Sequence, residues 1–156
     1  MRAMQISRFG GPEVFQLIEA PQPSAGPGEV LVKVGVAGVN FAETSMRQNK
    51  FMVNPALPAI LGSEVAGTVV ALGAGVSGIS IGARVAAPLF ASGVRSGGYS
   101  EYIVIKAEFA IALPEDIPFE TAVALLVQGM TALYLTRQFP PKGKVVLVNS
   151  AAGGVG

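Results

Sequence analysis

The residue spacing that indicates chemistry most clearly lies in residues 145–156, where an apolar run meets a glycine-rich turn. Residues 145–148 (Val-Val-Leu-Val) are typical of a buried strand. Small residues in the turn that follows let backbone N–H groups approach a pyrophosphate. In the spacing Gly-x-Gly-x-x-Gly, Ala151 replaces the first glycine, so an ordinary turn remains an alternative. We expect a dinucleotide to be bound by Ser150, Ala151, Gly153, Gly154, Val155 and Gly156.

The composition limits the chemistry that other residues can perform. The 156 residues include no cysteine and no histidine. Disulfides, thiolate or imidazole zinc sites, and Ser-His or Cys-His catalysis are therefore excluded within this chain. Asp116 is the one aspartate, and the nine glutamates are scattered, so we expect no metal site. Any redox chemistry would then run without a metal.

The charge pattern restricts the partners. Charged residues make up 13% of the chain and the net charge is +1, so neither nucleic acid nor an anionic membrane surface is expected as a partner. Residues 65–83 carry no charge, yet five glycines interrupt them, which favours a strand, a turn and a strand over a membrane span. The absence of cysteine is compatible with a reducing compartment, and we expect a cytoplasmic protein.

The elements that must position these residues are mostly strands. Alternating and β-branched patterns predict strands over 2–8, 14–19, 30–39, 64–72, 83–89 and 99–106, with a short helix over 41–47. After Pro114, two helices with apolar faces are predicted, over 118–126 and 129–135. We therefore expect a mainly β domain over 1–120 and the start of an α/β domain over 121–156.

Seven ordered blocks resemble the zinc-free medium-chain reductases of the quinone oxidoreductase type. They cover nearly the whole chain and are 37–43 (Ala-Gly-Val-Asn-Phe-Ala-Glu), 62–67 (Gly-Ser-Glu-Val-Ala-Gly), 69–76, 82–85, 97–102, 125–132 and 151–156. The resemblance implies a GroES-like catalytic domain followed by a Rossmann cofactor domain. Members of this family are roughly twice as long, so we expect an N-terminal part with both domains incomplete.

The resemblance also implies the absence of zinc. Zinc-dependent relatives place a cysteine near Asn40 and a histidine at the position of Ser63, and neither is present. NADPH is then the expected cofactor and a quinone or an enone the expected acceptor, with a homodimer expected for the whole protein. The family's Gly-Asp-Arg-Val block has Ala83 in place of the aspartate, and Glu43 stands where an aspartate is common.

Three polar residues are candidates for a catalytic role by this resemblance. Asn40 would lie beside the nicotinamide, although its position before the helix over 41–47 is also typical of a helix cap. Glu43 would orient Asn40 or relay a proton, whereas the pattern alone favours a solvated first-turn carboxylate. Glu64 lies in an apolar strand, where it would support the site or, as we favour, pair with Arg84.

Three further residues are candidates for contacts with the cofactor. Phe51 stands at an aromatic position that flanks the cofactor in the family, although a core role is also compatible with it. Gln128 and Thr131 are three positions apart on an apolar helix and so share one face. They would bind the nicotinamide carboxamide, with bonding between helices as the alternative.

The predicted function is the N-terminal catalytic part of an NADPH-dependent, zinc-free oxidoreductase that transfers hydride to a quinone or an enone. Enoyl-reductase domains of polyketide synthases resemble the same pattern and are the alternative among enzymes. The alternative from another class is a non-catalytic module that binds a partner through exposed apolar surface.

Overall fold

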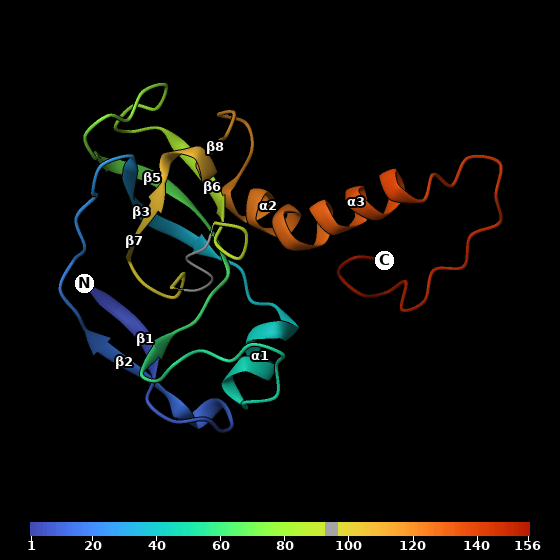
Figure 1. Ribbon diagram of the computed structural model, residues 1–156, viewed down its shortest axis with the longest axis horizontal. Helices are drawn as coiled ribbons and strands as arrows, with labels where there is room; N and C mark the ends of the chain where they lie inside the picture. Colours follow the sequence, from blue (N-terminus) through green and yellow to red (C-terminus); the bar gives the residue numbers. More distant parts are fainter. Residues whose placement is uncertain (93–96) are drawn as a thin grey trace.

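Two antiparallel sheets form the body of the molecule (Figure 1). The structure, a computed structural model, describes residues 1–92 and 97–156. One sheet has the strand order β2-β1-β4, and the other has the order β7-β3-β5-β6-β8. The strands are β1 (Arg2–Ile6), β2 (Phe15–Glu19), β3 (Glu29–Ala37), β4 (Ala59–Ile60), β5 (Glu64–Leu72), β6 (Arg84–Pro88), β7 (Tyr102–Lys106) and β8 (Ile111–Ala112). The mainly β architecture expected from the sequence is confirmed.

The pairing of β3 with β5 forms the centre of the larger sheet, and its two register shifts bend the strands. Four of the nine residues in each strand are β-branched, and such side chains pack well on a pleated surface. Their inner faces bury Val30, Val32, Val65 and Val69 in the main core. Gly67 allows β5 to approach β3, since a Cβ there would lie 2.1 Å from the Lys33 carbonyl oxygen. The close pairing fixes the N-terminal end of β5, where Glu64 lies.

The helix α1 (Phe41–Arg47) follows β3, as the sequence predicts. Two short 3-10 turns, η1 (Pro12–Val14) and η2 (Ala107–Phe109), connect strands. Beyond β8, the segments α2 (Phe119–Ala124), η3 (Leu125–Gly129) and α3 (Met130–Gln138) form one continuous helix rather than the two expected. The middle segment η3 is a π turn, a distortion that is frequent at functional sites.

The α2–α3 helix packs on the β domain through its first part only. Ala122, Val123 and Leu126 pack against Ala66 and Ala86 of the larger sheet. α3 extends away from the sheets (Figure 1). By length and composition the helix would suffice to cross a membrane, but core helices of soluble proteins pass the same test, so this is weak evidence.

The strand expected over residues 145–148 is not formed. These residues carry no strand assignment, and their large apolar side chains are exposed. A strand acquires its hydrogen bonds from a neighbouring strand, and no described strand pairs with residues 145–148. The expected buried strand is therefore wrong for this structure, because a strand depends on a pairing partner.

Candidate functional site

Asn40 stands at the centre of a buried network that joins three distant segments. Its side-chain Nδ2 donates to Glu64 Oε1 over 2.8 Å. Gln128 Nε2 donates to Asn40 Oδ1 over 2.5 Å. Because partners hold the side chain at both its nitrogen and its oxygen, the amide of Asn40 is fixed in one orientation. The network therefore unites the sequence candidates Asn40, Glu64 and Gln128.

Glu64 is buried, with 2% of its surface exposed. Its second oxygen, Oε2, accepts from the backbone N–H of Val127, in the π turn η3, over 2.9 Å. Burial raises the pKa of the Glu64 carboxyl group, and the nearby Glu43 adds to this, while the bonds from Asn40 and Val127 oppose it. A Cβ at Gly38 would lie 2.1 Å from Glu64 Oε1, so only glycine leaves room for this carboxylate.

The expected pairing of Glu64 with Arg84 is wrong. In the β5–β6 ladder, Glu64 lies opposite Pro88, and Arg84 lies opposite Thr68, four positions further along β5. Arg84 instead donates to the carbonyl oxygens of Pro114, Glu115 and Ile117, and its guanidinium lies 4.6 Å from the centre of the Phe119 ring. Arg84 thus binds the segment that leads into α2. The Glu64 carboxylate instead accepts hydrogen bonds from Asn40 and Val127.

Glu43 is not the solvated carboxylate that the pattern favoured. Its side chain is buried, with 3% of the residue exposed. Glu43 Oε2 accepts from the backbone N–H of Asn40 over 2.9 Å, which is half of a capping box at the start of α1. Glu43 Oε1 accepts from the backbone N–H of Ser63 over 3.0 Å and also from the Ser63 hydroxyl. Asn40 is therefore both a helix cap and a member of the buried network.

A cavity of about 550 Å³ opens beside Asn40, and we call it the Asn40 cavity. Its polar groups include Asn40 and Ser63, and its walls are mostly apolar: Ala42, Met46, Phe51, Val53, Pro55, Phe90 and Val127. Phe51 is held in place by Asn54, which accepts from the Phe51 N–H over 3.1 Å and donates to its carbonyl oxygen over 2.9 Å. Phe51 thus lines the same cavity as Asn40.

Thr131 and the glycine-rich turn lie outside the Asn40 cavity. Thr131 Oγ1 donates to the Val127 carbonyl of its own helix over 2.6 Å. The turn over 150–156 lines another cavity, of about 680 Å³, together with one side of α3. It nevertheless packs against Gln128, since a Cβ at Gly154 would lie 2.6 Å from Gln128 Cγ. Gln128 therefore links the turn to Asn40.

Sequence reasoning missed the roles of Ser63, Phe90 and the Val127 N–H. The adjacent polar pair Ser63-Glu64, between Leu61 and Val65, was a usable signal, because buried polar residues require partners. No such signal exists for the Val127 N–H or for Phe90. The type of an apolar side chain indicates neither which group its backbone N–H binds nor which cavity the side chain lines. Within residues 1–92 and 97–156, no three carboxylates, cysteines or histidines gather in a way suited to a metal ion.

The family model for the alcohol dehydrogenase GroES-like domain matches residues 26–115, which contain Asn40, Glu43 and Glu64. The chain belongs to this family. The GroES-like fold expected for the β domain is thereby confirmed, and the matched range ends close before α2.

Individual relatives match nearly the whole chain and are longer than it. The quinone oxidoreductase of Pseudomonas aeruginosa is 40% identical over 157 residues, which are 99% of this chain and 47% of that protein. The rat synaptic vesicle membrane protein VAT-1 homolog is 38% identical over 160 residues, 100% of this chain and 38% of that protein. The chain spans about half the length of the curated quinone oxidoreductases that it matches.

One solved structure with a similar backbone fold belongs to a protein that was also described in complex with NADPH. The quinone oxidoreductase of Thermus thermophilus, described alone and in complex with NADPH, superimposes with a TM-score of 0.82 at 34% identity. The superposition covers 99% of this chain and 47% of that one. The resemblance of this GroES-like chain to zinc-free medium-chain reductases of the quinone oxidoreductase type is confirmed.

Proposed function

We propose that this chain is the N-terminal catalytic part of an NADPH-dependent, zinc-free oxidoreductase that transfers hydride to a quinone or an enone. The fixed amide of Asn40 at the wall of the Asn40 cavity carries this proposal. Since an amide group has two N–H donors and an oxygen with two lone pairs, Asn40 retains one donor and one lone pair for a ligand.

The site suits the nicotinamide end of NADPH and a flat acceptor. Its volume of about 550 Å³ falls in the usual range for small-molecule sites, and its walls are apolar with few polar groups. NADPH, when bound, supplies the hydride. Asn40 would donate to the acceptor oxygen or fix the ring, while Phe51 and Phe90 would keep water out.

The remaining cofactor contacts in this proposal come from the C-terminal part of the chain. Gln128 would hold Asn40 and meet the carboxamide, with Thr131 on the same helix. The pyrophosphate would lie at the glycine-rich turn, residues 150–156, which packs against Gln128. We assign residues 1–120 to the catalytic domain and 121–156 to the start of the cofactor domain.

The roles of Glu43 and Glu64 in this proposal are to position other groups. Glu64 would hold the amide of Asn40 from the strand side. Glu43 would hold the backbone N–H of Asn40 and the hydroxyl of Ser63, which faces the same cavity. A proton for the reduced acceptor would come from solvent or from this hydroxyl–carboxylate pair.

A titration with NADPH tests the proposal directly. The chain has no tryptophan, so the fluorescence of the cofactor itself reports binding. We expect saturable binding that Asn40→Ala weakens about tenfold, the effect of losing a buried hydrogen-bonding group. Gln48→Ala, at an exposed residue just after α1, is the matched control. Absence of binding at sub-millimolar NADPH would contradict catalysis by this chain.

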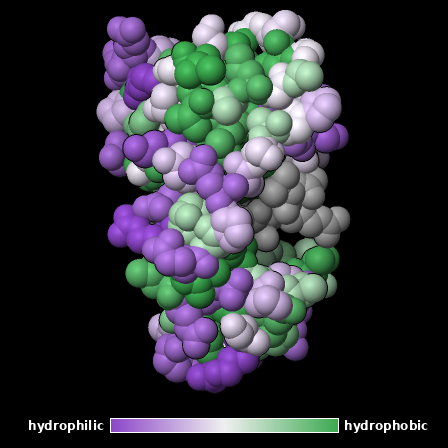
Figure 2. Space-filling model, turned by 90° about the vertical axis from the view of Figure 1, so that its left-hand side faces the viewer, coloured by the Kyte–Doolittle hydropathy of each residue, from purple (hydrophilic) through white to green (hydrophobic). Residues whose placement is uncertain are grey.

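A second candidate function, an interaction module, is favoured by apolar exposure in the C-terminal part. The exposed side chains include Leu125, Met130, Leu133, Tyr134, Leu135, Phe139 and Val145–Val148. The face of the β domain that points away from α3 shows hydrophobic groups in its upper part and more hydrophilic groups at its lower end (Figure 2). Light scattering on the purified chain, combined with the NADPH titration, distinguishes the oxidoreductase from the interaction module. A stable assembly that does not bind NADPH would favour the interaction module.

A further inference from the structure

The hydrogen bonds that join Gln128, Asn40 and Glu64 form a chain with one direction. Gln128 donates from Nε2 to Asn40 Oδ1, and Asn40 donates from Nδ2 to Glu64 Oε1. Both donors therefore point toward Glu64. The side-chain amides of Asn40 and Gln128 each carry donors and an acceptor, so a half-turn of both amides would give a chain of the opposite direction. Neither amide decides the direction by itself.

The backbone N–H of Val127 anchors the Glu64 end of this chain. It donates to Glu64 Oε2 over 2.9 Å, and a backbone N–H cannot exchange places with an acceptor as an amide side chain can. Val127 lies in the π turn η3, where the Met130 N–H donates to the Leu125 carbonyl, five positions earlier. Both oxygens of Glu64 accept a bond, whereas a protonated carboxyl group would turn its O–H toward one of the two donors. Glu64 thus acts as an acceptor only, and Asn40 has to present Nδ2 to it.

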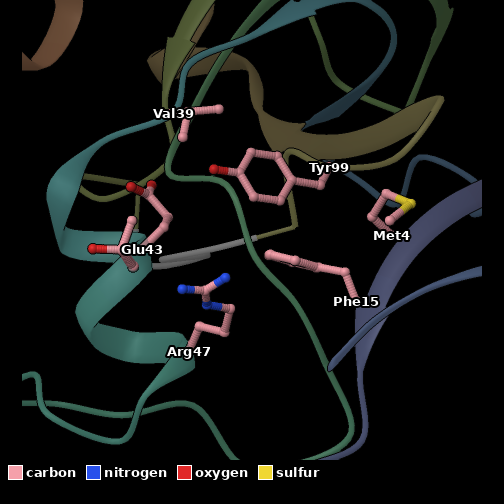
Figure 3. A pocket seen from close by; sticks show the side chains of 7 residues that line it. Met4, Phe15, Val39, Glu43, Arg47 and Tyr99 are labelled. Atoms are coloured by element: carbon pink, nitrogen blue, oxygen red, sulfur yellow. The ribbon is translucent and has the colours of Figure 1, made fainter. Parts of the chain in front are cut away.

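The position of Asn40 at the start of α1 leaves its side-chain amide free to take either orientation. The Glu43 N–H donates to the backbone carbonyl oxygen of Asn40 over 3.2 Å. Glu43 Oε2 accepts from the backbone N–H of Asn40, and Figure 3 shows the Glu43 carboxylate beside the segment that runs from Val39 into α1. Both bonds use backbone atoms of Asn40, so its side-chain amide can turn without breaking them.

We propose that Glu64 is the positioning residue that sets the direction of this hydrogen-bond chain, and with it the places of donor and acceptor on Asn40. With a carboxylate at Glu64, Asn40 keeps its second N–H on the nitrogen that faces Glu64 and its second lone pair on the oxygen that faces Gln128. Reversal of the chain would exchange these two positions at the wall of the Asn40 cavity. A ligand oxygen placed to accept the N–H would then meet another oxygen.

Glu64→Gln tests this role because it removes the charge and keeps the shape of the side chain. Only 2% of Glu64 is exposed, so an unpaired donor there is costly. The Val127 N–H still requires an oxygen, and the NH₂ group that the substitution introduces has to point at Asn40. Asn40 then accepts with Oδ1 and donates with Nδ2 to Gln128 Oε1, so every donor keeps an acceptor. The free energy of unfolding near neutral pH should therefore be unchanged or higher, since a buried charge is also lost.

Scalar couplings across the hydrogen bonds of the ¹⁵N,¹³C-labelled chain show which nitrogen donates to which carbonyl carbon. In the unmodified chain we expect couplings from Asn40 Nδ2 to Glu64 Cδ and from Gln128 Nε2 to Asn40 Cγ. In Glu64→Gln the second coupling should vanish, and one from Asn40 Nδ2 to Gln128 Cδ should appear. Glu120→Gln, at an exposed residue in the first turn of α2, should keep both original couplings. Persistence of the coupling from Gln128 to Asn40 in Glu64→Gln would overturn the proposal. So would the opposite direction in the unmodified chain, a measurement that requires no variant to fold.

The affinity for NADPH gives a second readout, which rests on the proposed function, whereas the couplings do not. Glu64→Gln should bind NADPH about tenfold more weakly by cofactor fluorescence, although its stability is not reduced. A merely structural role of Glu64 would lower stability and affinity together. Glu120→Gln should bind NADPH like the unmodified chain. Equal affinity in a variant with reversed couplings would overturn the effect on the ligand. Absence of NADPH binding by the unmodified chain would contradict the proposed function, and the couplings would then decide the direction of the chain alone.

Discussion

The side-chain amide of Asn40 donates to the Glu64 carboxylate over 2.8 Å, although the two residues are 24 positions apart and begin different elements. Asn40 caps α1, and Glu64 begins β5. The bond therefore links the N-terminus of α1 to the N-terminal end of β5 in the larger sheet. Because Gln128 donates to the other end of the same amide, the C-terminal helix is bound to this junction as well.

Removal of the Gln128 amide should loosen Asn40. In Gln128→Met the Asn40 oxygen loses its donor, and the affinity for NADPH should fall about three- to tenfold, corresponding to about 1 kcal/mol. Cofactor fluorescence measures the change. Gln138→Met, at the exposed end of α3, is the matched control and should bind NADPH like the unmodified chain. If both variants bind equally, Gln128 does not position Asn40 for the cofactor.

Stability should depend on pH through Glu64. Its pKa is raised in the folded state, so the folded chain binds more protons than the unfolded chain between the ordinary value of 4.5 and the raised value. The free energy of unfolding should therefore decrease as the pH rises through this window. Urea unfolding between pH 4.5 and 7 measures the slope, and Glu64→Gln should remove this contribution.

Glu13 and Glu101 have lowered pKa values in the folded chain, so they change the free energy of unfolding in a different pH range from Glu64. Their contribution to stability is present above their unfolded pKa values and is lost as the pH falls toward the folded values. The pH dependence of stability that comes from Glu64 falls at higher pH, above the ordinary carboxyl pKa of 4.5. An identical slope in Glu64→Gln and in the unmodified chain between pH 4.5 and 7 would contradict the role of Glu64.

Glu43→Gln should destabilise the chain. The substituted amide has one oxygen for the donors of Asn40 and Ser63, and its NH₂ group would face at least one of them. We expect a loss of about 1–3 kcal/mol in the free energy of unfolding. Urea unfolding measures it. Glu120→Gln, at an exposed glutamate in the first turn of α2, should change stability much less.

Arg84→Lys should weaken the attachment of α2 to the β domain. Arg84 donates to three carbonyl oxygens, those of Pro114, Glu115 and Ile117, and stacks on Phe119, which one ammonium group does not reproduce. We expect a loss of about 1–2 kcal/mol in thermal or urea unfolding. Arg137→Lys is the control on the exposed face of α3, and a loss of equal size there would contradict the role of Arg84.

Local sequence patterns determined much of the β domain. The antiparallel pair β1 and β2, the strand β5 over 64–72 and the helix α1 over 41–47 lie where the sequence predicts them. These elements follow from side-chain periodicity and from capping, which act between residues close in the chain. The absence of cysteine and histidine likewise settled, without a structure, that thiolate and imidazole ligands are missing.

Tertiary structure decided the partners of the polar residues. Glu64 was expected to pair with Arg84, and the register of β5 against β6 separates the two. Glu43 was expected in solvent, and the approach of Ser63 buries it. The strand over 145–148 likewise required a neighbouring strand. Each outcome depends on contacts between residues distant in the chain, as with Asn40 and Gln128, 88 positions apart. Side-chain type and spacing indicate that a polar group needs a partner, but only the packed backbone brings a particular partner within hydrogen-bonding distance.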